Sequence, residues 1–119
     1  MTEILQALRE LTESVSAATT EDDAWRWRAR QQLSKVRELL SQVPNPSAPE
    51  VAARSLATYL QRQNLMARIG ALGPRITSSV EVDTVAEDVR RLVSDLVHHV
   101  QRVNDLAWDA VELELGGSE

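Results

Sequence analysis

Between residues 85 and 113 the apolar residues recur at alternating steps of four and three, and no Pro or Gly interrupts them. The positions are Val85, Val89, Leu92, Leu96, His99, Val103, Leu106, Ala110 and Leu113, with one histidine among the apolar residues. This spacing lines up side chains on one face of an α-helix and is typical of helices that pack lengthwise. A helix over residues 85–115 would be roughly 46 Å long, which predicts a helical bundle built around one long C-terminal helix.

Three shorter amphipathic segments precede this helix. We predict helices over residues 3–17, 21–43 and 48–72, with Thr20 and Ser47 as N-caps of the second and third. Together with the long helix they predict an all-α fold, an antiparallel four-helix bundle that forms a single domain over residues 1–119.

The third predicted helix is expected to bury one apolar face, made of Ala52, Leu56, Tyr59, Met66 and Ile69. Gly73 followed by Pro74 predicts its end, because Pro cannot continue a helix without losing a hydrogen bond. Residues 73–84 are then expected to form an extended loop on the bundle, and Thr84 with Glu87 would form the capping box of the last helix.

Composition narrows the function classes. The chain has 119 residues and no cysteine, which excludes disulfides and thiolate zinc sites. A net charge of −5 disfavours nucleic acid as a partner, and no segment approaches the ~18 apolar residues that a membrane span needs. The segment 1–9 does not resemble a secretory signal. We expect a cytoplasmic protein without cofactor, metal or membrane association, and its single lysine and lack of Phe favour a GC-rich bacterial genome.

The end of the long helix is the first candidate site. Trp108, Val111 and Leu115 form a second apolar line, away from the line that continues the core, with acidic residues between the two. A helix that is apolar on two sides is buried twice, and Trp is favoured in interfaces. This pattern predicts a protein partner or a homo-oligomer such as a homodimer, unless the helix predicted over residues 3–17 covers the second line.

The second candidate lies at the start of the second helix, in the run Trp25-Arg26-Trp27-Arg28-Ala29-Arg30. Side chains two residues apart on a helix point in directions that differ by about 200°, so Trp25 and Trp27 cannot both face one core. One of them is expected to be exposed or stacked under an arginine. With Arg26 and Arg30, this basic face would bind an acidic helix, or RNA, or pair internally with the acidic end of the long helix.

Two histidines stand in the middle of the long helix. His99 occupies a core position, where a polar residue usually fixes the register, and His98 points outward with its acidic neighbours too widely spread to share a metal ion. Arg91 and His98 have the spacing of the catalytic pair in the HEPN helical ribonucleases, which this chain also resembles in size. That resemblance implies an alternative function, a metal-independent ribonuclease acting as a dimer, with Arg91 stabilising phosphate charge and His98 polarising the attacking hydroxyl. Leu92 and Val100 depart from the usual motif.

Two segments carry a further resemblance. Residues 72–77 (Leu-Gly-Pro-Arg-Ile-Thr) and 89–98 (Val-Arg-Arg-Leu-Val-Ser-Asp-Leu-Val-His), with the Trp–Arg start of the second helix, resemble small helical accessory proteins of actinobacterial conflict systems. Those systems are associated with caspases and TPR repeats (CATRA-type). The resemblance implies a non-catalytic adaptor in a bacterial defence or signalling assembly. It transfers no functional residues.

Overall fold

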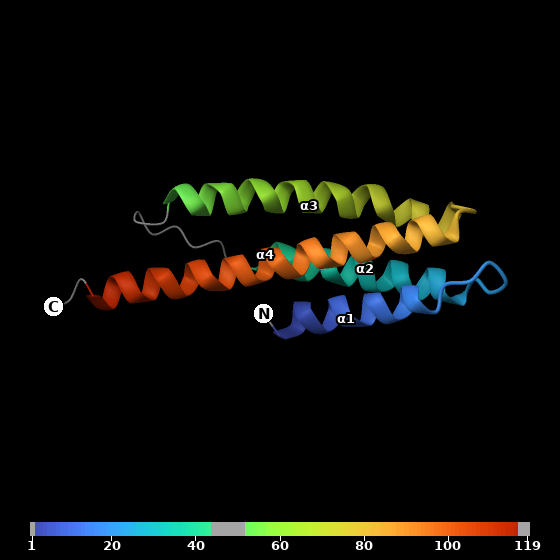
Figure 1. Ribbon diagram of the computed structural model, residues 1–119, viewed down its shortest axis with the longest axis horizontal. Coiled ribbons are helices and arrows are strands. Elements are labelled where there is room, and N and C mark those ends of the chain that lie inside the picture. Colours follow the sequence, from blue (N-terminus) through green and yellow to red (C-terminus); the bar gives the residue numbers. More distant parts are fainter. Residues whose placement is uncertain (1, 44–51, 117–119) are drawn as a thin grey trace.

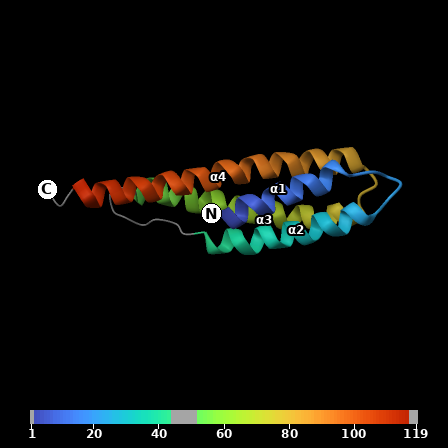
Figure 2. The same ribbon diagram turned by 90° about the horizontal axis from the view of Figure 1, so that it is seen from below.

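Four antiparallel α-helices make up the structure, a computed structural model that describes residues 2–43 and 52–116 and their side chains except those of 52 and 110–116. The helices are α1 (Thr2–Ser16), α2 (Ala24–Gln42), α3 (Ala52–Ser78) and α4 (Val82–Gly116). They pack in a ring in which α1 contacts α2 and α4, and α3 contacts α2 and α4, so that α2 and α4 lie diagonally opposite (Figures 1 and 2). The predicted all-α bundle with a long C-terminal helix is confirmed.

Three of the helices contribute apolar stripes at helical spacing to the core. α1 buries Ile4, Leu8, Leu11 and Val15, and α2 buries Ala29, Leu33, Val36, Leu40 and Val43. From α4 the core takes every described member of the stripe, from Val85 to Leu106, including His99. Heptad-like spacing along these helices therefore places one continuous seam at the centre of the bundle.

Helix α2 begins three residues later than predicted. Thr20 does not cap it; the N-cap is Asp23, and the Asp22 carboxylate accepts a hydrogen bond from the backbone N–H of Ala24 at 2.9 Å. Short Asp side chains readily form such turns just before a helix, and here they compete with a cap at Thr20. Helix α2 ends at Gln42, followed by Val43 in an extended conformation, as expected for a residue that precedes proline.

Helix α3 continues through Gly73 and Pro74 to Ser78, so the predicted stop and the extended loop over 73–84 are wrong. A proline ring normally clashes with the Cβ of the preceding residue and the carbonyl four residues back. Here the preceding residue is Gly73, which has no Cβ, so the first of these two clashes is absent. Ile76 is consequently a buried helical residue, and only residues 79–81 separate α3 from α4.

Helix α4 starts earlier than predicted, because the connector that precedes it is so short. The Glu81 carbonyl accepts the backbone hydrogen bond of Val85 at 3.1 Å, which puts the start of the helix at Val82. Thr84 therefore lies inside the first turn rather than at the cap, and the capping box predicted from Thr84 and Glu87 does not form. The N-cap predicted at Ser47 lies outside the described residues.

The buried face of α3 is not the predicted one. Its core residues are Ser55, Thr58, Leu65, Ile69, Leu72 and Ile76, which follow one another at heptad-like spacing. Of the predicted face only Ile69 is buried, Met66 is half-buried, and Ala52 lies outside the described side chains. Leu56 and Tyr59, expected in the core, are 60% and 47% exposed. The apolar residues from Leu65 to Ile76 determine which face of α3 points into the core. Toward the N-terminus the same face carries the polar residues Ser55 and Thr58.

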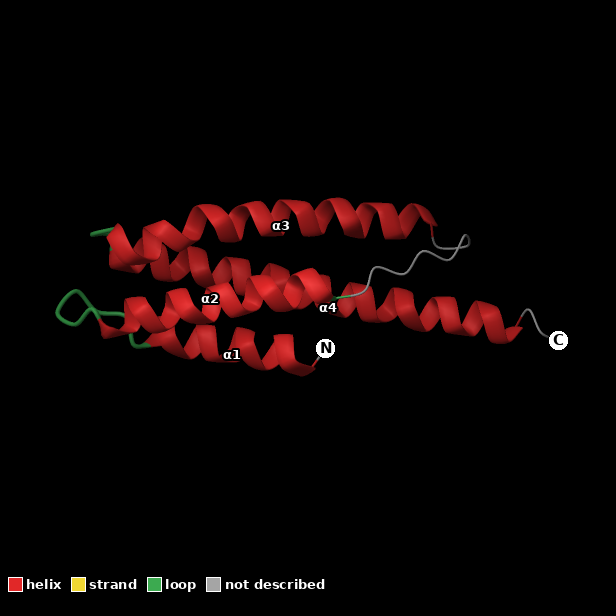
Figure 3. Cartoon of the chain, turned by 180° about the vertical axis from the view of Figure 1, so that it is seen from behind, coloured by secondary structure: helices red, strands yellow, loops and turns green. Residues whose placement is uncertain are grey.

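The four helices differ in length, and this divides the molecule into two regions. α1 and α2 have 15 and 19 residues, whereas α3 and α4 have 27 and 35. The side chain of Arg62 donates a hydrogen bond to the carbonyl of Val43 at the end of α2, and the start of α1 lies beside the middle of α4 (Figures 1 and 2). Residues 52–61 of α3 and 100–116 of α4 thus continue as a two-helix arm beyond α1 and α2 (Figure 3).

Candidate interaction surface

The interior of the arm is small and polar on the α3 side. Ser55 and Thr58 are 5% and 0% exposed, and the Thr58 hydroxyl donates to the Arg54 carbonyl at 2.8 Å. On the α4 side Val103 and Leu106 are buried. The large apolar residues of α3 therefore take no part in the described interior of the arm.

Those large residues lie on the outside. Leu56, Tyr59 and Leu60, here called the α3 stripe, stand at helical spacing and are 60%, 47% and 58% exposed. Arg54 faces α4, and Leu56, two residues later, points about 200° away from that direction. The α3 stripe is a contiguous apolar patch with no described neighbour over it, and sequence reasoning missed it as a surface.

Trp108 is the exposed tryptophan of α4, with 62% of its surface accessible. The interpretation in which α1 covers this side chain is therefore excluded. The backbone of α4 stays helical to Gly116, while the side chains of Val111 and Leu115 lie outside the described residues. Of the three residues of the predicted site, the structure thus places Trp108 at the surface of the arm and does not describe the side chains of Val111 and Leu115.

A regular ladder of polar pairs fixes how α3 and α4 lie against each other. Its rungs, at heptad intervals along both helices, are Arg54–Asp109 at 2.7 Å, Gln61–Arg102 at 3.2 Å, Arg68–Asp95 at 2.6 Å and Arg75–Asp88 at 2.7 Å. Three rungs place an arginine on α3 opposite an aspartate on α4. The acidic end of α4 therefore pairs with α3 and not, as one interpretation of the sequence had it, with the basic helix α2.

At the base of the arm a buried histidine replaces an apolar core residue. His99 Nε2 accepts a hydrogen bond from Arg62 Nε at 3.4 Å, and its Nδ1 lies 2.9 Å from Gln61 Oε1. Because Gln61 Oε1 can only accept, this geometry assigns the neutral tautomer with its proton on Nδ1. Burial, with Arg62 and Arg102 nearby, lowers the pKa of His99 to about 4. The core position predicted for His99 is confirmed, and the ring is held as a neutral structural group.

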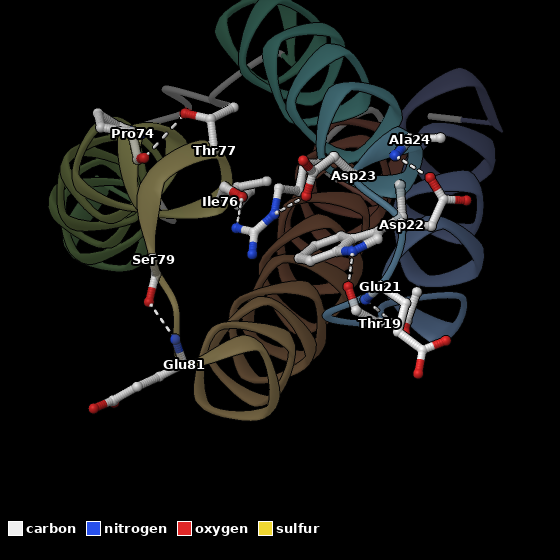
Figure 4. Close-up of polar contacts among 12 residues, drawn as sticks. Thr19, Glu21, Asp22, Asp23, Ala24, Pro74, Ile76, Thr77, Ser79 and Glu81 are labelled. Atoms are coloured by element: carbon white, nitrogen blue, oxygen red, sulfur yellow. Dashed lines mark hydrogen bonds and ion pairs between the residues drawn. The ribbon is translucent and has the colours of Figure 1, made fainter.

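The first tryptophan of α2 is part of the core. Trp25 is 1% exposed, its Nε1 donates to the Thr19 carbonyl at 2.9 Å, and the Arg26 guanidinium lies 4.9 Å from its ring centroid. Arg26 also donates to the Ile76 carbonyl at 2.9 Å (Figure 4). The structure therefore gives Trp25 and Arg26 an internal role, joining the start of α2 to the end of α3, instead of an open contact surface.

Trp27 is the exposed member of the pair, at 63%. It shares a shallow depression at the connector between α3 and α4 with Val80, which is 87% exposed. Arg30 donates to the Thr77 hydroxyl at 2.9 Å. Of the second predicted contact, only Trp27 offers a large apolar surface, at the end of the bundle opposite the arm.

The candidate ribonuclease pair lies on the outer surface of α4. Arg91 and His98 are exposed, and a separation of seven residues puts them on one face, about 10 Å apart along the axis. Arg91 pairs with Glu87 at 3.4 Å, which partly neutralises its charge. Among the described residues no group of His, Cys, Asp or Glu is placed to hold a metal ion.

Charge is divided between the helices. α2 carries five basic residues and one acidic, and α3 carries four arginines and no acidic residue. α4 carries eight acidic residues and three basic, and after Arg102 all of its charges are negative. The α3 stripe therefore lies on a basic helix and Trp108 on an acidic segment of α4.

Comparisons with protein-family models, with curated proteins and with solved structures find no match to this chain. No helix in the part of the chain that the structure describes has the length and apolarity that a membrane span requires.

Proposed function

We propose that this chain is a non-catalytic protein–protein interaction module, an adaptor whose contact surface is the two-helix arm. The observation that carries the proposal is the exposure of the α3 stripe and Trp108 on the parts of α3 and α4 that extend beyond the ends of α1 and α2. Large apolar side chains gathered on one part of a small protein mark sites of association. Trp and Tyr are also the residues most often found at the energetic centre of interfaces.

The mechanism is helix-on-helix burial, with charge setting the orientation. An incoming helix that covers the stripe removes Leu56, Tyr59 and Leu60 from water, which is the favourable term. The carboxylates near the end of α4 then favour partner segments of basic charge and disfavour acidic ones. The resemblance to actinobacterial accessory proteins supports placing this adaptor in a cytoplasmic bacterial defence or signalling assembly.

Affinity purification from the native host tests this proposal with charge-matched variants. Leu60→Glu and Trp108→Glu place a carboxylate on the arm, whereas Ala67→Glu and Ser94→Glu place one at exposed positions in the same heptad registers outside it. We expect bound proteins to be lost with both arm variants and retained with both controls. A bound set that survives both arm variants contradicts the proposal.

A dimeric ribonuclease is the second candidate function, favoured by the exposure of Arg91 and His98 on one face of α4. It makes the opposite prediction, since cleavage of RNA would end with Arg91→Ala or His98→Ala. The adaptor keeps its binding in both of these variants.

A further inference from the structure

We infer that acid releases the end of α2 from the base of the arm, because protonation of His99 breaks the hydrogen bonds through which Arg62 joins the two. The inference concerns the junction between the four-helix region and the arm, and it does not depend on the proposed function. Three observations carry it: the hydrogen bonds between α2 and α3, the contacts of the His99 ring, and the charges around that ring.

Helix α2 is joined to α3 near both of its ends by hydrogen bonds from arginine side chains. At its start Arg26 donates to the Ile76 carbonyl at 2.9 Å. At its end the Val43 carbonyl accepts from Arg62 Nη1 at 2.6 Å. Arg62 also donates through Nε to His99 at 3.4 Å, so the bond at the end of α2 is linked to a histidine, the side chain that changes its charge most readily in mild acid.

Protonation of His99 removes the acceptor that Arg62 uses. In the neutral ring Nε2 accepts from Arg62, and the proton on Nδ1 points at Gln61 Oε1. A protonated ring carries a hydrogen on both nitrogens, so two positively charged donors would face each other at 3.4 Å. The His99 side chain is fully buried and Arg62 is half-buried, so the arginine is the group that moves toward water. Its departure takes the hydrogen bond away from the Val43 carbonyl.

The charges around the ring oppose its protonation while the junction is closed. Burial, then Arg62 on α3 and Arg102 on α4, lower the pKa of His99 to about 4. Asp95, one turn earlier on α4, is paired with Arg68, and none of the buried residues of α1 and α2 is charged. In the open junction the ring meets water and its pKa returns to about 6.5, so acid favours opening. Between pH 7 and pH 5 these two values raise the equilibrium constant for opening by about 20-fold.

Hydrogen exchange of the full chain at pH 7 and pH 5 tests the inference, with protection expressed relative to the intrinsic exchange rate at each pH. We expect the protection of backbone amides 40–43, at the end of α2, to fall by as much as about 20-fold in acid. Amides 28–31, near the start of the helix where Arg26 joins it to α3, should keep theirs. His99→Gln retains a donor and an acceptor but does not titrate, and it should abolish the fall. The exposed neighbour supplies the matched control, since His98→Gln should retain it.

Three outcomes would overturn the inference. An equal fall at both ends of α2 would show that acid weakens the whole bundle instead of releasing one end. Unchanged protection of amides 40–43 would show that the junction stays closed. Both results come from the wild type, so they hold even if a variant fails to fold. A fall that persists in folded His99→Gln would assign the acid response to another group.

Discussion

The four-helix region and the arm differ in which side chains of α3 they bury. In the four-helix region α3 turns Leu65, Ile69, Leu72 and Ile76 inward. In the arm the same helix, in the same register, turns Ser55 and Thr58 inward and Leu56 and Leu60 outward. In the arm the buried side of α3 is therefore polar and its large apolar side chains are exposed, which is the arrangement that the proposed contact surface requires.

Truncation of a core residue should show the largest contrast between the two regions. Leu96→Ala removes a fully buried side chain of α4 and is expected to lower the free energy of unfolding by about 2–5 kcal/mol. Leu56→Ala removes a side chain that is 60% exposed and should change it by about 0.5 kcal/mol or less in the monomer. Urea unfolding at a concentration where the chain is monomeric measures both. Equal losses would show that the arm carries a core of its own.

A fall in pH should lower the stability of the junction between the four-helix region and the arm, because His99 becomes protonated. Its pKa is about 4 in the folded chain and near 6.5 when unfolded, so between these values the unfolded state binds more protons. The contribution of neutral His99 is complete above pH 6.5 and is lost as the pH falls toward 4, to a total of up to about 3 kcal/mol.

The variant His99→Gln keeps a polar side chain at this position but does not titrate. Urea unfolding at pH 7 and pH 4.5 should show a smaller acid-induced loss of stability in this variant than in the wild type. The exposed His98 supplies the control, because His98→Gln should lose as much stability as the wild type. Identical pH dependence in all three proteins would rule out a buried neutral His99.

A smaller effect is expected from the outermost rung of the ladder. Arg54 and Asp109 are 58% and 40% exposed, and exposed ion pairs contribute about 0.2–1 kcal/mol. Arg54→Ala should therefore leave global stability almost unchanged and speed hydrogen exchange in residues 53–61 alone. Arg68→Ala, at a rung inside the four-helix region, is the comparison, and faster exchange throughout α3 in the Arg54 variant would contradict this division.

The smallest effect is expected from the double variant Arg91→Ala/His98→Ala. Both side chains are exposed and lie outside the arm, so the free energy of unfolding should change by about 0.5 kcal/mol or less and association should be unchanged. A purified chain that cleaves RNA, and stops doing so in this variant, would establish the ribonuclease instead.

How far the sequence could predict this molecule depends on the length of each apolar pattern. In α4 the stripe runs without a break, and its period fixed both the helix and its buried face. α1 and α2 were predictable for the same reason. His99 was assigned to the core because the stripe continued through it.

For α3 the sequence alone predicts the wrong buried face, because Gly73 and Pro74 interrupt its heptad-like apolar pattern. Gly73–Pro74 indicated an end to the helix, which removed Ile76 from the apolar series. Without Ile76, the apolar Leu56 and Tyr59 looked like the buried face. Extending the spacing of Ile76, Leu72, Ile69 and Leu65 toward the N-terminus leads to Thr58 and Ser55, and that extension would have revealed the α3 stripe as a surface.

Trp108 was predicted as a surface residue because it falls off the core stripe of α4, and its exposure agrees with that. Which of Trp25 and Trp27 is buried depends on the tertiary structure. Spacing showed that only one of them could be buried, but the Thr19 carbonyl that accepts from Trp25 comes from the connector before α2, whose path no periodicity specifies.

The most direct test of the account is site-specific photo-crosslinking in the native host, with a photoreactive residue at position 60 and, as the matched control, at position 67. Both positions are exposed on the same line of α3, one heptad apart, and only the first belongs to the arm. The account predicts a protein adduct from position 60, of twice the chain mass if the partner is a second copy, and none from position 67. Absence of any adduct at position 60, or equal adducts at both positions, would contradict the claim that the arm is the contact surface.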